Sequence, residues 1–185
     1  MRTAVPTTIG ASVAGLALAA VLAGPARADQ MLYSYDPASP PTRELAPTGL
    51  TFLFDKRAFG GAAIRRIIQT GERGSADLKS ASESGLGAGG LKAGLGGKPA
   101  VGHLYEIAGD RDGKAFVSAV CPGAARAWLV IGPLRRFRDL RIQAVGRDAG
   151  AAGPKPCAEL LLSFHNDWVM PHRPPPRVRF PRNLP

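Results

Sequence analysis

The chain has 185 residues, 24 Lys and Arg against 14 Asp and Glu, and two cysteines. This length suits one domain with a buried core. The net charge of +10 favours anionic partners but does not determine the fold. Beyond the N-terminal region no apolar stretch approaches the length of a membrane span, which excludes a helical membrane domain there.

The N-terminus has the three parts of a secretory signal peptide. Met1-Arg2 is a positively charged start, residues 9–23 are apolar or small, and Ala26-Arg27-Ala28 is a small-x-small cleavage site. We therefore predict a signal peptide at 1–28, cleaved after Ala28, and location in the periplasm or outside the cell. The alternative is an uncleaved anchor. Export makes nucleic acid a poor candidate partner, and the cleaved protein should have no transmembrane segment.

The two cysteines, Cys121 and Cys157, are predicted to form a structural disulfide. Exported proteins fold in an oxidising compartment, where paired cysteines are usually bonded. Redox pairs usually have Cys-x-x-Cys spacing, and a zinc site needs more than two distant thiols. In the chain-entropy model this bond stabilises the fold by roughly 4 kcal/mol.

The first half of the remaining chain is punctuated by proline and glycine. Residues 29–48 are predicted to be extended, because their prolines disfavour a helix, although residues 31–35 could pair as an edge strand. Residues 50–54 form the first predicted strand. Residues 62–70 fit a helix by the spacing of Ile64, Ile67 and Ile68, but β-branching and flanking glycines favour a strand.

Seven of the fifteen residues from 84 to 98 are glycine, and we predict a flexible loop there. Residues 85–90 match Gly-x-Gly-x-x-Gly literally. A dinucleotide site needs that turn between a buried strand and a helix, whereas polar residues precede it and glycines follow it. The composition therefore does not support a nucleotide site, and we predict no cofactor.

From residue 103 onward, short apolar runs alternate with turn residues, which is typical of β-structure. The predicted strands are residues 103–108, 115–121, 126–131, 139–145 and 157–169, with a hairpin turn at 109–113. We predict an all-β domain at 29–170, an antiparallel β-sandwich with a β-barrel as the alternative. Trp128 should pack in its core, against the disulfide, and Trp168 should be half exposed. Residues 171–185, rich in Pro and Arg, should form an extended tail.

Three groups of residues resemble catalytic or metal sites only in part. Ser163, His165 and Asp167 are predicted to share one strand face, but neighbours at i and i+2 are about 6.6 Å apart, too far for a catalytic triad. His103, His165 and His172 lack metal-ligand spacing. The Asp and Gly residues of 109–113 match only part of a calcium loop. We predict no metal site and no catalytic residue.

Two arginine clusters are the candidate binding residues. They are Arg135, Arg136, Arg138 and Arg141 in one segment, and Arg173, Arg177, Arg179 and Arg182 in the C-terminal tail. Arginine side chains suit phosphate and carboxylate groups. The leading hypothesis is a non-catalytic binding or structural accessory domain for an anionic envelope polymer, lipid head groups or a partner protein. The alternatives are a small hydrolase with a site assembled from distant residues, and a metal-dependent module.

Overall fold

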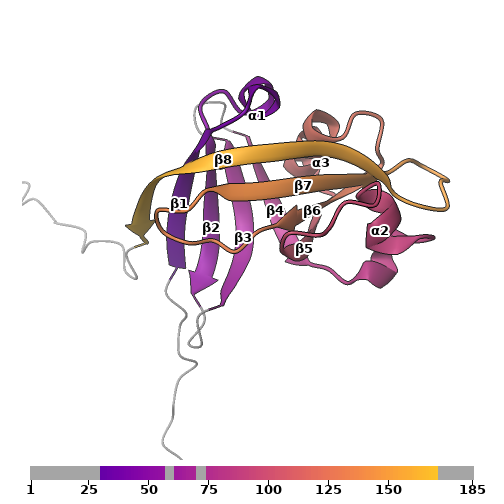
Figure 1. Ribbon diagram of the computed structural model, residues 1–185, viewed down its shortest axis with the longest axis horizontal. Helices are drawn as coiled ribbons and strands as arrows, with labels where there is room; N and C mark the ends of the chain where they lie inside the picture. Colours follow the sequence, from indigo (N-terminus) through magenta and orange to yellow (C-terminus); the bar gives the residue numbers. More distant parts are fainter. Residues whose placement is uncertain (1–29, 57–60, 70–73, 171–185) are drawn as a thin grey trace, which may run out of the picture.

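The structure, a computed structural model, describes residues 30–56, 61–69 and 74–170, and shows one β-barrel with short helices at its periphery (Figure 1). The predicted signal peptide and the predicted C-terminal tail lie outside the described residues. Among the residues described, no helix is long and apolar enough to cross a membrane.

The described elements are eight strands and four short helical segments. In chain order they are β1 (Gln30–Pro37), α1 (Pro40–Leu45), β2 (Leu50–Lys56), β3 (Ala62–Gln69), β4 (Ser75–Ser80), the 3-10 turn η1 (Glu83–Leu86), α2 (Gly90–Gly94), β5 (His103–Ile107), α3 (Arg111–Val120), β6 (Arg126–Ile131), β7 (Leu140–Arg147) and β8 (Lys155–Val169).

Each strand pairs antiparallel with the next in sequence, and β1 also pairs with β8, which closes the barrel. The prediction of a sandwich was therefore wrong, and its barrel alternative is confirmed. The alternating pattern of each strand is the same in both architectures, because both have one buried face. What distinguishes them is whether the two edge strands meet. Strand β1 was expected at an edge, but it pairs on both sides.

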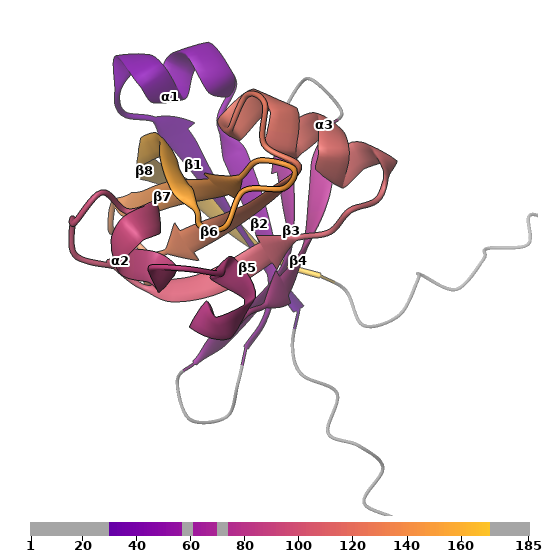
Figure 2. The same cartoon turned by 90° about the vertical axis from the view of Figure 1, so that its right-hand side faces the viewer.

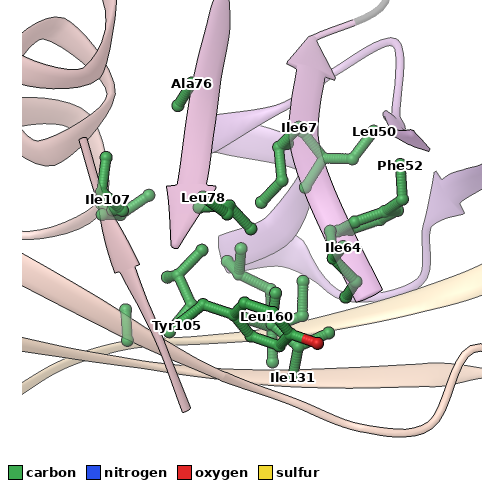
Figure 3. Close-up of a cluster of buried hydrophobic side chains, with 14 of the residues drawn as sticks. Leu50, Phe52, Ile64, Ile67, Ala76, Leu78, Tyr105, Ile107, Ile131 and Leu160 are labelled. Carbon is green, nitrogen blue, oxygen red and sulfur yellow. The ribbon is translucent and has the colours of Figure 1, made fainter. Parts of the chain in front are cut away.

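The barrel interior is filled with apolar side chains, as Figure 3 shows for Ile64, Leu78 and Tyr105, which point toward one another from three strands. Strands β5, β7 and β8 each bury one face in this interior. Their buried side chains include Tyr105, Ile107, Leu140, Ile142, Ala144, Leu160 and Leu162. Each large aliphatic or aromatic side chain buried in this way stabilises the fold by roughly 1.5–3 kcal/mol.

Strands β3 and β4 complete the first half of the barrel. Residues 62–69 form strand β3, so the strand alternative was right for this segment. Strand β4 was missed, because only Ala76 and Leu78 of its six residues are buried. Short strands with so few apolar residues resemble polar loops in the sequence.

Helices α1 and α3 both lie at one end of the barrel (Figures 1 and 2). A helix at α1 was not expected, because its first residues are Pro40 and Pro41. Proline is tolerated in the first turn, where the backbone N–H has no helical partner. Ser39 caps the helix by accepting a hydrogen bond from the Thr42 N–H.

Helix α3 replaces the hairpin predicted at 109–113 and the strand predicted at 115–121. Asp110 is its N-cap, and the Gly113 N–H donates to the Asp110 Oδ1 at 2.7 Å. Phe116, Val117 and Val120 share one buried helical face. Gly113 is required for packing, because a Cβ there would lie 1.8 Å from the Ala108 carbonyl oxygen. The same Asp and Gly residues thus serve a helix cap here and not a turn.

The predicted disulfide is present and joins Cys121 to Cys157. Cys121 follows helix α3 rather than a strand, so the bond fastens this helix to strand β8. Its sulfur atoms lie over Gly146, where a Cβ would be 2.1 Å from the Cys121 Sγ. The glycine in strand β7 therefore provides the space that the disulfide occupies.

The glycine-rich segment contains η1 and α2 and covers the outer face of strands β6 and β7 (Figure 2). Leu86 and Leu95 are buried there against Trp128 and Val145, in a second apolar cluster outside the barrel. Trp128 is therefore in a core, as predicted, but under this segment and not in the apolar cluster that holds Cys121 and Cys157. The prediction of a flexible loop rested on glycine content and did not consider these leucines.

Replacing both cysteines with serine should lower the free energy of unfolding by roughly 4 kcal/mol, because the bond restricts a 36-residue separation in the unfolded chain. Urea unfolding followed by circular dichroism measures this change. A reductant should destabilise the wild type by a similar amount and leave the double variant unaffected. An unchanged midpoint in the double variant would contradict a structural role for the bond.

Candidate functional site

The end of the barrel opposite α1 and α3 opens into a cavity of about 580 Å³. The alternation of strand directions places the β6–β7 connection at this end. The first and last described residues also lie here, since the Met170 N–H donates to the Gln30 carbonyl at 2.9 Å. One end of the barrel is thus covered by helices, and the other gives access to its interior.

Apolar side chains from the strands form the floor and walls of this cavity. Phe54, Ile64, Tyr105 and Ile131 are almost fully removed from solvent. The apolar lining residues are Met31, Phe54, Ala62, Ile64, Ile131, Pro133, Leu134 and Val169. Eight-stranded barrels have an interior that side chains can fill or that can hold one small ligand. The apolar core fills this barrel, and the cavity lies over that core at the end opposite α1 and α3.

Basic groups gather at the rim of the cavity. Lys56 from β2, His103 from β5, and Arg135 and Arg136 from the β6–β7 connection all line it. Both arginines belong to the cluster predicted from sequence to bind anions, and the structure brings them to the mouth of an apolar cavity. A neutral or negatively charged head group would be accommodated there more easily than a positive one.

Arg136 is held in place by Asp167, with which it forms an ion pair, and it also lies near the Tyr33 hydroxyl. The hydrogen bond and charge of Asp167 raise the pKa of Arg136, and Tyr33 adds to that effect. Asp167 reaches the mouth because a bulge in the β1–β8 pairing, between Ser34 and Tyr35, shifts the register. Asp167 consequently pairs with the inward-facing Tyr33, and its side chain is only 15 % exposed.

Arg135 differs from Arg136, because it forms no ion pair with any residue in the described part of the chain. It lines the main cavity and also an adjoining groove of about 370 Å³, in which Arg138 is a second basic group. An arginine without a protein carboxylate retains its five donors for a ligand. Arg135 is therefore the residue best placed to bind an anionic group at the mouth.

Tyr35 lies below the mouth and is a buried polar group in an otherwise apolar interior. Its ring packs edge-on against Phe52 and Phe164, with centroid distances of 5.6 and 5.7 Å. The hydroxyl has no partner with good hydrogen-bond geometry. Burial raises the pKa of Tyr35 well above its ordinary value, nearby Tyr33 raises it further, and the Arg135 backbone amide offsets only part of the rise.

The other predicted arginines are placed differently. Arg141 lies on the outer face of β7, where its Nε is 2.5 Å from Glu159, and it does not line the main cavity. Arg141, together with Lys98, holds the pKa of Glu159 below its usual range. The four tail residues, Arg173, Arg177, Arg179 and Arg182, lie outside the described residues.

The histidines and acids considered for catalysis are not brought together. The prediction that Ser163, His165 and Asp167 share one face was wrong, because the β1–β8 bulge turns Asp167 inward. The His165 Nδ1 instead lies 2.9 Å from Asp36 on the exposed surface. Asp110 caps α3, and no cluster of three potential metal ligands occurs within the described ranges.

A second concavity, of about 520 Å³, lies over the disulfide between α1, α3 and β8. Its charged lining residues are one acid and one base, Glu44 and Lys155, and the rest are mostly proline, alanine and aliphatic groups. None of the described residues that line it is aromatic. The open end of the barrel, where aromatic and basic groups converge, is therefore the stronger candidate site.

Sequence reasoning missed Tyr33, Asp167 and His103 as residues of the mouth. Their inward or rim positions depend on the β1–β8 pairing and on which barrel end each strand reaches. The arginine cluster was the part of the site with a visible sequence pattern. Searches against protein-family models, curated proteins and solved structures found no match.

Replacing Tyr35 with phenylalanine should leave the free energy of unfolding at pH 7 unchanged or raise it by up to about 1 kcal/mol, because the substitution removes a buried hydroxyl without a good partner. Burial raises the pKa of Tyr35 in the folded protein above its unfolded value of 10.0. Above pH 10 the tyrosine therefore ionises in the unfolded chain before it does in the folded protein, and the free energy of unfolding of the wild type falls as the pH rises. At about pH 11 the wild type should have lost roughly 1.4 kcal/mol more than the variant. Urea unfolding at both pH values checks this, and parallel pH dependences would contradict it.

Proposed function

We propose that the protein is a non-catalytic binding protein that holds a small amphiphilic anion in the open end of its barrel. The observation that carries this proposal is the combination of an apolar cavity of about 580 Å³ with an arginine, Arg135, at its mouth. The volume falls within the range typical of small-molecule sites. The apolar part of the ligand would lie in the barrel, with its anionic group at the rim.

The chemistry of the walls supports an acyl or aromatic acid as the ligand. Each methylene group buried against the accessible apolar lining residues, such as Ala62, Leu134 and Val169, contributes about 0.8 kcal/mol to binding. A carboxylate, sulfonate or phosphate at the mouth would accept hydrogen bonds from Arg135 in a bidentate arrangement. Arg136 is already paired with Asp167, so it shapes the mouth rather than supplying net charge.

This proposal specifies the expectation of an anionic envelope ligand. The predicted export of the chain would place the barrel in the cell envelope or outside the cell, where amphiphilic acids are available as components or products of membrane lipids. A cavity of this size accommodates one small molecule, or one end of a larger one, and not a folded partner. We propose no metal or cofactor for this function.

The hydrolase alternative gains no support from the geometry. His103 is the histidine at the cavity, and none of the described residues that line the cavity is serine, threonine, cysteine, aspartate or glutamate. Nucleophilic catalysis needs a nucleophile within hydrogen-bond reach of its base. The binding function therefore has the stronger structural basis.

The proposal predicts saturable one-to-one binding of a fluorescent amphiphilic acid, such as a dansyl-labelled fatty acid. Replacing Arg135 with glutamine should weaken binding about tenfold, since a hydrogen bond to a charged group contributes about 1.5 kcal/mol or more. Replacing Ala62 with tryptophan should fill the mouth and abolish binding, because Ala62 lines the cavity at the start of strand β3. Fluorescence titration measures both changes.

Arg43→Gln is the matched control, because Arg43 is an exposed arginine on α1 at the opposite end of the barrel. It should bind the probe like the wild type. Circular dichroism should show that every variant is folded. Equal affinity in Arg135→Gln, Ala62→Trp and the wild type would show that the probe does not bind in the barrel, and the proposal would fail.

A further inference from the structure

The rim of the open end carries exposed apolar side chains beside its basic residues. Phe137 is 82 % exposed, Val169 58 % and Trp168 47 %, and Met170 is also exposed. Single exposed apolar residues are common on protein surfaces, but a group of them at one place indicates an interaction surface. Two of these four residues are aromatic, as is typical of segments that lie at a membrane interface.

These residues come from two segments that are in contact. Arg136 of the β6–β7 connection pairs with Asp167 of β8, and the ring of Phe137 lies 5.4 Å from that of Phe164. Trp168 and Val169 directly follow Asp167 in the chain, and Val169 lines the cavity. The exposed apolar side chains therefore surround one side of the mouth.

The apolar surface continues from the rim onto the outside of the barrel. Trp168 lies opposite Leu32 in the β1–β8 pairing, and Leu32 lies opposite Leu53 in the β1–β2 pairing. Residues opposite one another across neighbouring strands share a face, so these three side chains form a row on the outer surface. The row and the rim together are the apolar mouth surface: Leu32, Leu53, Phe137, Trp168, Val169 and Met170.

The backbone of Phe137 is a further indication of a functional role. Its φ is +57°, in the left-handed region that bulky side chains rarely adopt. The ring is nevertheless largely exposed to solvent, and it makes a T-shaped contact with Phe164. Core packing therefore does not account for an aromatic residue at this position.

Basic groups accompany the apolar mouth surface. Lys56, Arg135 and Arg138 are exposed at or beside the mouth, and the described chain ends here at Met170. The next fifteen residues contain Arg173, Arg177, Arg179 and Arg182. The described chain therefore ends beside the basic rim, and the four arginines follow this point in the sequence.

We propose that the open end of the barrel docks on an anionic lipid bilayer, with Phe137 and Trp168 in the head-group region and the rim arginines against lipid phosphates. Exposed aromatic side chains favour a bilayer over a soluble polyanion, which offers no apolar layer for them. Adjacent basic residues add electrostatic attraction to anionic lipids. Docking does not depend on the proposed ligand, although it would bring the cavity next to a source of amphiphilic acids.

The test uses the chain from Asp29 to Pro185, which contains the complete barrel and lacks the apolar N-terminal segment that could bind vesicles by itself. Sedimentation with vesicles should show binding to phosphatidylcholine mixed with phosphatidylglycerol, little binding to phosphatidylcholine alone, and weaker binding at high salt. Trp168 emission should shift to the blue on docking. The chain has only two tryptophans and Trp128 is already buried, so the shift reports Trp168.

Variants at the mouth should weaken partitioning selectively. Phe137→Ser and Trp168→Ser should each lower it about tenfold, and Arg135→Gln about fivefold. Leu161→Ser is the matched control, because Leu161 is a comparably exposed apolar residue of β8 but its carbonyl accepts from Ala38, beside α1. It should partition like the unsubstituted chain.

The proposal is overturned if both kinds of vesicle bind equally, or if the two mouth variants behave like Leu161→Ser. Binding to dextran sulfate as strong as to anionic vesicles, with no effect of Phe137→Ser, would indicate a soluble polyanion as partner and would also overturn it. The Ala62→Trp variant should no longer bind the fluorescent acid but should still bind anionic vesicles. This variant separates a failure of docking from a failure of the proposed ligand site.

Discussion

The pairing of β1 with β8 is the constraint on which the rest of the structure depends. It leaves the described sheet with no free edge and gives the barrel an interior with two ends. The bulge within this pairing has a second consequence, since it turns Asp167 inward beside Tyr33. Without the bulge, alternation along β8 would place Asp167 on the outer surface. The β1–β8 pairing that closes the sheet therefore also places Asp167 beside the mouth.

The two ends of the barrel are unlike because helix α3 fills only one of them. Phe116, Val117 and Val120 join the interior core, and the disulfide after the helix fixes it to β8. The opposite end has no described helix over it, and the cavity lies there above the apolar core. The packed end stabilises the domain, and the opposite end, whose walls include core residues such as Ile64 and Tyr105, is available for a ligand.

Much of the fold could be predicted from local patterns, and the errors have physical causes. Short apolar runs between turn residues identified β2, β5, β6, β7 and β8, and the predicted compartment suggested the disulfide. Helix α3 was missed because Asp is favoured at helix N-caps as well as in turns, and Asp112-Gly113 is a typical hairpin dipeptide. Barrel closure was left as an alternative, because pairing between the first and last strands leaves no local pattern. Of the site, the arginine cluster was predicted, whereas the inward turn of Asp167 depends on register.

The two neighbouring arginines show how position divides one residue type into two roles. Arg136 lies against Asp167, and together they present a wall with little net charge to the cavity. Arg135 has no such carboxylate among the described residues, and its charge is available at the mouth. If both were unpaired, the entrance would carry two neighbouring positive charges, which would repel each other at low salt. Pairing one of them fixes the β6–β7 connection against β8, and that fixed connection is what holds both Arg135 and Phe137 at the rim.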